Sequence, residues 1–64
     1  MKIATNKIKN IMDKKGISTV ELAFRMGVKE SWIYAVLAGD QGKTFKSVER
    51  LAKALGVEEL EIIE

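Results

Sequence analysis

The side chains best suited to specific contacts lie between residues 29 and 38, which contain three small residues and two aromatic ones. At 100° per residue of an α-helix, Ser31, Ala35 and Ala38 fall at the centre of one face, and Trp32 and Tyr34 flank it. A serine hydroxyl can hydrogen-bond to the edges of several bases, and an alanine methyl group can meet that of a thymine. This segment therefore favours non-covalent recognition.

The sequence offers little for catalysis or metal binding. It contains no histidine and no cysteine, so the usual nucleophile and base pairs, zinc sites and disulfides are missing. Its carboxylates are scattered over expected helix surfaces, and no glycine-rich loop has the spacing that cradles phosphates. We expect no enzyme activity, no metal, no cofactor and no small-molecule ligand.

The length of 64 residues allows one domain with a small core. No apolar run approaches the roughly 20 residues of a membrane span, and the N-terminus lacks the charged-then-apolar order of a signal peptide. We expect residues 1–64 to form a single soluble, cytoplasmic domain with no membrane partner.

Positive charge is distributed unevenly along the chain. The net charge is only +2, but residues 1–57 carry all 11 basic residues against five acidic ones, whereas residues 58–64 carry four glutamates. A basic body with an acidic end is typical of a protein that attracts a phosphate backbone. For any single lysine, simple solvation of a helix surface is the better interpretation.

Residues 18–39 predict two short amphipathic helices joined by a glycine turn. Ser18 can cap the first helix, Glu21 can complete a capping box, and Gly27 can end the helix in a left-handed conformation. The apolar residues that indicate the two helices are Val20, Leu22, Ala23 and Met26, followed by Ile33, Val36 and Leu37.

Further helices are expected on either side. One runs from about Thr5, its cap, to Lys15, and another follows Thr44 and ends near Leu55. The final segment, Val57 to Glu64, fits either a short fifth helix or a short strand. The inward residues expected in the two flanking helices are Ile8, Ile11 and Met12, and Phe45, Val48, Leu51, Ala52 and Leu55.

Residues 18–39 resemble the helix-turn-helix of the phage repressor and Cro-like family. The likeness rests on the small residue Ala23, the turn glycine Gly27, and apolar residues at Leu22, Met26, Val28, Ile33 and Val36. With the flanking helices it covers roughly residues 8–60. It implies a compact all-α, five-helix domain of the lambda-repressor type that binds double-stranded DNA as a dimeric repressor.

The resemblance also implies which residues touch DNA. Glu30, Ser31 and Ala35 match positions that usually contact bases, and Thr19 matches one that usually holds a phosphate. No glutamine, asparagine or arginine on this helix can make the bidentate contact that discriminates bases most strongly. We expect base contacts from Lys29, Glu30, Ser31, Trp32, Tyr34 and Ala35, and phosphate contacts from Thr19, Gln41, Lys43 and Lys46.

Relatives often carry an arginine at the position of Met12 and a glutamate at that of Leu37, which resemble a buried ion pair. Replacement of both partners by apolar residues is often neutral or stabilising, whereas loss of only one partner would leave a buried charge without a counter-charge. We therefore expect Met12 and Leu37 to touch each other.

The apolar residues at the chain end predict a second copy of the chain. Leu60, Ile62 and Ile63 are expected to form a dimer interface, since paired helix-turn-helix proteins place two recognition helices in successive major grooves. These residues can instead cap the core of the single chain.

A different class of function is also compatible with the sequence. Trp32 and Tyr34 can form an exposed aromatic patch that binds another protein, as in an antitoxin-like or anti-repressor module. Burial of either aromatic against neighbouring helices would weaken that alternative.

Overall fold

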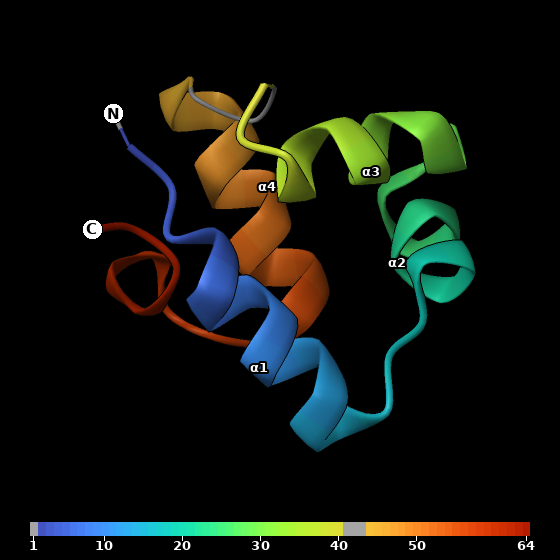
Figure 1. Cartoon of the computed structure of the whole chain (residues 1–64), viewed down its shortest axis with the longest axis horizontal. Coiled ribbons are helices and arrows are strands. Elements are labelled where there is room, and N and C mark those ends of the chain that lie inside the picture. The colour runs from blue at the N-terminus through green and yellow to red at the C-terminus, as the bar shows by residue number, and fades with distance from the viewer. Residues whose placement is uncertain (1, 41–43) are drawn as a thin grey trace.

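The computed structural model describes residues 2–40 and 44–64. Over these residues the chain forms four α-helices and one short turn of 3₁₀ helix (Figure 1). The all-α class is confirmed, but the expectation of five helices is wrong. The elements are α1 (Thr5–Lys15), α2 (Thr19–Met26), α3 (Glu30–Leu37), α4 (Phe45–Leu55) and the 3₁₀ turn η1 (Glu59–Glu61).

The last segment does not continue as a helix because its apolar residues must reach the core. After η1 the chain turns inward at Ile62, which has no exposed surface. It then pairs with the start of the chain: the Ala4 N–H donates to the Ile62 carbonyl at 2.8 Å, and Ile3 and Ile63 form an isolated antiparallel bridge. The segment is therefore neither of the regular elements expected for it.

The position of Ile62 corrects one prediction for the dimer interface. Its side chain is fully buried within the chain itself, so it cannot meet a second copy. Leu60, by contrast, is 78% exposed, and Ile63 is half-buried. Only the latter two remain candidates for an interface.

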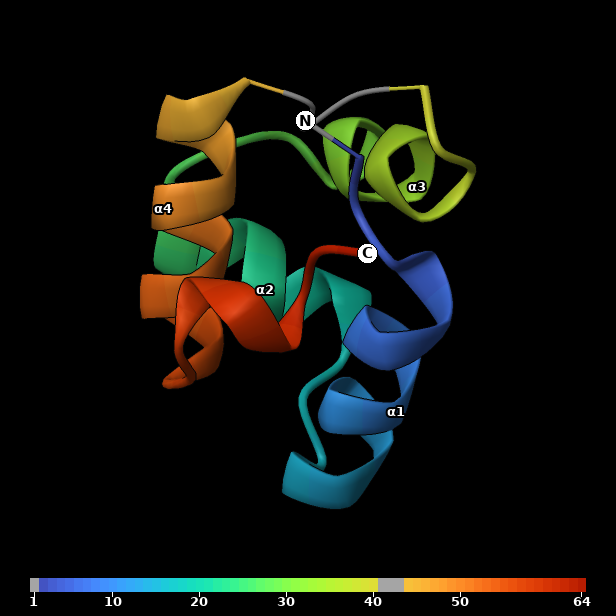
Figure 2. The ribbon, with the colours of Figure 1, turned by 90° about the vertical axis from the view of Figure 1, so that its left-hand side faces the viewer.

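All four α-helices of the described residues contribute to one core, in which α2 packs against α3 and α4, and η1 lies against α4 (Figure 2). Phe45 is expected to face inward, but it is 59% exposed because it is the first residue of α4. Val20, one of the apolar residues that indicate α2, is 62% exposed. The fully buried large side chains are Ile8, Leu22, Ile33, Val36, Val48, Leu51, Leu55 and Ile62.

The corner between α2 and α3 forms as its capping residues predict. The Ser18 side chain accepts the Glu21 N–H, and Gly27 adopts φ 68°. The Val28 N–H donates to the Ala23 carbonyl at 3.0 Å, which closes the helix end. The capping box is only half present, because the Glu21 carboxylate pairs with Arg25. At α1, too, the cap differs from the expected Thr5 and is Ala4.

Two arginines tie α2 to α4 in a reciprocal way. Arg25 of α2 donates from Nη1 to the Ala54 carbonyl at 3.0 Å, and Arg50 of α4 donates from Nη2 to the Met26 carbonyl at 2.7 Å. Carbonyls in the last turn of a helix have no partner within the helix, so these bonds satisfy groups that would otherwise need water. These two hydrogen bonds fix the position of α2 relative to α4.

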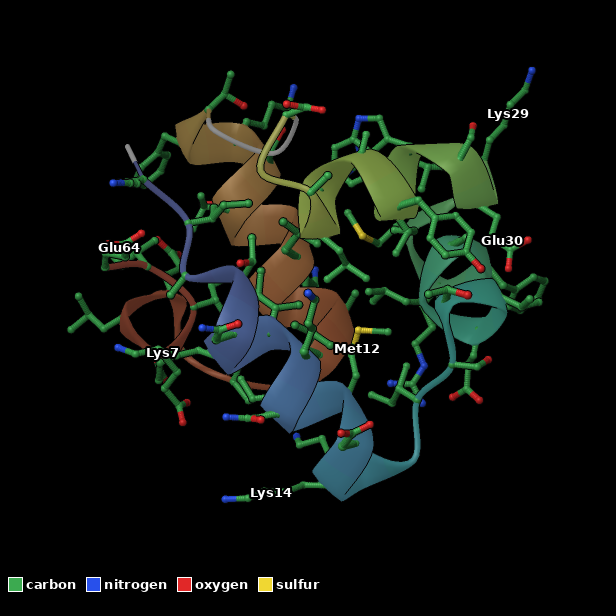
Figure 3. The ribbon with its side chains drawn as sticks, viewed as in Figure 1. Lys7, Met12, Lys14, Lys29, Glu30 and Glu64 are labelled. Carbon is green, nitrogen blue, oxygen red and sulfur yellow. The ribbon has the colours of Figure 1, made fainter. Side chains whose placement is uncertain are left out.

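Met12 and Leu37 both pack in or against the single hydrophobic core. Met12 belongs to the core and points inward from α1 (Figure 3), and Leu37 packs against the same core. Helices α1 and α3 are in contact. This arrangement agrees with an apolar replacement of an ion pair, while direct contact of the two side chains stays a prediction.

Replacing Ile62 by alanine tests its assignment to the core. Because truncation of a fully buried isoleucine leaves a cavity, Ile62→Ala should lower the free energy of unfolding by about 2–5 kcal/mol. Urea denaturation followed by circular dichroism measures this change. Leu60→Ala is the control, and at a concentration where the chain is monomeric it should cost less than about 0.5 kcal/mol. Equal effects of the two substitutions would contradict the assignment.

Candidate nucleic-acid interface

Helix α3 lies at one end of the molecule. In both Figure 1 and Figure 2 it occupies the top, while the C-terminal end of α1 occupies the bottom. Its inner residues Ile33 and Val36 are fully buried, so the rotation of α3 about its axis is set by packing. The opposite face is consequently held toward solvent.

The outer face of α3 carries the small residues that helical periodicity predicts there. Ser31 and Ala38 are exposed, and Ala35 is half-exposed. Trp32 is half-buried and packs against the core, which weakens the alternative of an exposed aromatic pair. Tyr34 is 57% exposed.

One flank of α3 borders a surface hollow of about 410 Å³. Four of the six residues expected to touch bases line it, namely Lys29, Ser31, Trp32 and Ala35, together with Val28. The Lys29 side chain does not cap α3 and extends away from the body of the molecule (Figure 3). The hollow has apolar walls formed by Trp32 and Ala35, with a hydroxyl and an ammonium group beside them, so it can receive a methyl group next to a hydrogen-bonding edge.

The other flank of α3 brings together Glu30, Tyr34 and Thr19. The Thr19 hydroxyl, at the start of α2, donates to Glu30 Oε2 at 3.0 Å and is hydrogen-bonded with the Tyr34 hydroxyl at 3.3 Å. Figure 3 shows Glu30 reaching from the start of α3 toward the side on which α2 lies. Residues expected to contact bases and a residue expected to contact phosphate are therefore linked to one another.

The sequence does not predict the hydrogen bond between Thr19 and Glu30. Thr19 and Glu30 are 11 positions apart and lie on different helices. Helical periodicity compares residues within one helix, so it contains no signal for a contact across the turn. The only hint in the sequence is that each residue is expected at the start of its helix.

The remaining phosphate candidates lie near or within the loop that follows α3. Lys46 is exposed in the first turn of α4, and α4 begins at the same end of the molecule as α3 (Figures 1 and 2). Gln41 and Lys43 lie outside the described residues.

Two further searches cover the described part of the chain, one for clusters of metal-ligating side chains and one for membrane-spanning helices. Among residues 2–40 and 44–64, no three acidic side chains gather closely enough to hold a metal ion. Within the same ranges, no helix is long and apolar enough to cross a bilayer.

A second hollow lies beside the chain end, away from the residues just described. It measures about 390 Å³ and is lined by Lys7, Asn10, Ile11, Leu60 and Glu61. Leu60 thus stands next to a depression that is partly apolar, and a basic and an acidic residue border the same depression.

Comparisons with known proteins agree with this geometry. The model of a helix-turn-helix family matches residues 8–62. Among solved structures, the chain is similar to the restriction-modification controller protein C.AhdI from Aeromonas hydrophila, with 28% identity and a TM-score of 0.79. The alignment covers 89% of this chain and 86% of that one. A search of curated protein sequences returned no match.

The matched region includes α2, α3, α4 and all of α1 except its first three residues. The family consists of DNA-binding regulators and not of enzymes, as expected from the missing catalytic residues. The chain belongs to the Cro/C1-type helix-turn-helix family of DNA-binding transcription regulators.

Proposed function

We propose that the chain binds double-stranded DNA sequence-specifically by placing α3 in the major groove, and that it acts as a dimeric repressor. The observation that carries this proposal is the division of α3 into a fully buried edge and an exposed face of short side chains. Short side chains let a helix approach base edges closely. The structural relative is named as a controller protein, and a regulatory role for this chain agrees with that name.

The hollow beside α3 accounts for part of the base readout. Ser31 and Lys29 supply donors that can meet base acceptors, and the walls formed by Trp32 and Ala35 suit a thymine methyl group. On the other flank, Tyr34 and Glu30 can reach further base edges or sugars. Because no bidentate contact is available, specificity depends on several weaker contacts acting together.

Phosphate contacts hold α3 in register. Thr19 stands at the start of α2, the helix that crosses the DNA backbone in this class of motif. Lys46 at the start of α4 can approach the same backbone from the other side, and Gln41 and Lys43, outside the described residues, are further candidates. Each lysine that neutralises a phosphate contributes about −0.9 to the slope of log affinity against log salt.

The second copy is proposed to dock at the hollow beside the chain end. Leu60 of one chain can enter the hollow of the other, and in a two-fold arrangement Lys7 of each chain can face Glu61 of its partner. Ile63, which is half-buried, borders this contact. One exposed leucine buries little area, so the dimer is expected to be weak alone and strengthened by DNA.

Selection of bound duplexes from a random DNA pool tests the proposal directly. Purified protein at two salt concentrations should recover a two-fold symmetric motif with half-sites about 34–36 Å apart, one helical turn. Recovery of no motif at either salt concentration would reject sequence-specific DNA binding. It would favour the protein-binding alternative.

A charged residue on the α3 face should abolish recognition without unfolding the chain. Ala35→Asp places a carboxylate where the helix would meet bases and phosphates, so affinity for the selected motif should fall by roughly a hundredfold or more. Fluorescence anisotropy with a labelled duplex measures it. Lys14→Gln changes the net charge equally at the far end of α1 (Figure 3) and should have less than about a threefold effect. Similar losses in both variants would point to net charge alone.

A charge at Leu60 should prevent dimer formation. Leu60→Lys places an ammonium group beside Lys7 in the proposed interface, and sedimentation equilibrium should then show monomers at concentrations where the unmodified chain dimerises. Val20→Lys makes the same change on the outer side of α2, where Val20 is exposed, and should leave the dimer intact. Dimerisation of Leu60→Lys at the original concentration would refute this interface.

A further inference from the structure

The contact between Thr19 and Glu30 limits what either residue can do when DNA arrives. A threonine hydroxyl carries one hydrogen, and a carboxylate can only accept. The hydrogen therefore goes to Glu30 Oε2, 3.0 Å away, and the Tyr34 hydroxyl lies 3.3 Å from the same Thr19 Oγ1. In the free chain the donor capacity of Thr19 is fully used.

A phosphate oxygen would compete with Glu30 for the same hydrogen. Both acceptors are anionic, so they cannot share one donor at close range without repulsion. For Thr19 to hold a phosphate, the carboxylate has to leave. The long glutamate side chain permits this movement, because Glu30 is the first residue of α3 and only half-buried.

The free energy of DNA binding depends on where the Glu30 carboxylate moves after it leaves Thr19. In the major groove the amino group of cytosine is a donor that suits a glutamate. At a site with a cytosine in reach, Glu30 exchanges one hydrogen bond for another. At a site where no base amino group is in reach, its charge is left near phosphates without a partner.

We propose that Glu30 is a specificity-determining residue that exchanges the Thr19 hydroxyl for a cytosine amino group on correct DNA and penalises incorrect DNA. This inference rests on the proposed function. Non-specific binding consists almost entirely of phosphate contacts, so the penalty falls mainly on such complexes. This exchange allows α3 to discriminate between DNA sequences although it has no arginine, asparagine or glutamine that could make a bidentate contact with a base.

Glu30→Gln tests the proposal because it removes the charge and keeps the length of the side chain. Affinity for a duplex without the selected motif should rise roughly five- to fiftyfold, as expected for loss of one like-charge contact. The salt slope of that binding should steepen by up to about 0.9. Repeating the DNA selection with this variant should lose the preference for cytosine at one position of each half-site.

Asp13→Asn is the matched control. It makes the same change in net charge near the C-terminal end of α1, opposite α3 (Figure 1). Its affinity for motif-free DNA should change less than about twofold. Thermal unfolding followed by circular dichroism establishes that each variant is folded at the assay temperature.

Variants of Thr19 separate competition for the hydroxyl from simple repulsion. In a Thr19→Val background the hydroxyl is absent, so the effect of Glu30→Gln on motif-free DNA should shrink to about half or less on a logarithmic scale. Thr19→Ser keeps the hydroxyl and should retain the full effect. Equal effects in the valine and serine backgrounds would overturn the competition.

The outcomes distinguish this inference from the proposed function. If the unmodified chain binds no duplex, both fail. If it selects a motif and Glu30→Gln leaves the affinity for motif-free DNA and the cytosine preference unchanged, only the role of Glu30 is overturned. Weaker binding of motif-free DNA by Glu30→Gln would likewise overturn it.

Discussion

Burial of one edge of α3 is the constraint on which the proposed interface depends. Ile33 and Val36 have almost no exposed surface, and α3 packs against both α2 and α1. A chain of 64 residues has a small core, so these two side chains are a substantial part of it. Because they fix the rotation of α3, they also determine that Ser31 and Ala35 face outward. Stability and recognition thus depend on the same eight-residue helix.

Several basic side chains donate hydrogen bonds to backbone carbonyls within the chain and are therefore less available to contact DNA than free lysines. Arg25 and Arg50 bind carbonyls across α2 and α4. Lys15 binds the Leu55 carbonyl at 2.8 Å, which satisfies the end of α4. The charge of the basic body therefore overstates the charge available at the α3 face. Among the described residues proposed to contact DNA near α3, the exposed lysines are Lys29 and Lys46. With so few positive charges at this face, the position of each carboxylate has a large effect on DNA binding.

The two flanks of α3 differ in chemistry. On one side an open hollow is lined by Trp32, Ala35, Ser31 and Lys29, and none of these needs to release a partner before it meets DNA. On the other side Thr19 is engaged by Glu30. The first flank can contact DNA directly, whereas on the second the bond between Thr19 and Glu30 has to break first. Glu30, at the start of α3, can therefore influence sequence selectivity without making a bidentate contact.

The sequence by itself determined the four α-helices of the described residues and the face of α3 that points outward. Ser18, Gly27 and the apolar period of α2 and α3 act within a few residues, so they can be recognised locally. Only the tertiary structure decided that Ile62 enters the core, that Arg25 and Arg50 clamp two helices, and that Thr19 binds Glu30. These contacts join residues far apart in the chain. They depend on how the helices are placed relative to one another, which periodicity and capping do not encode.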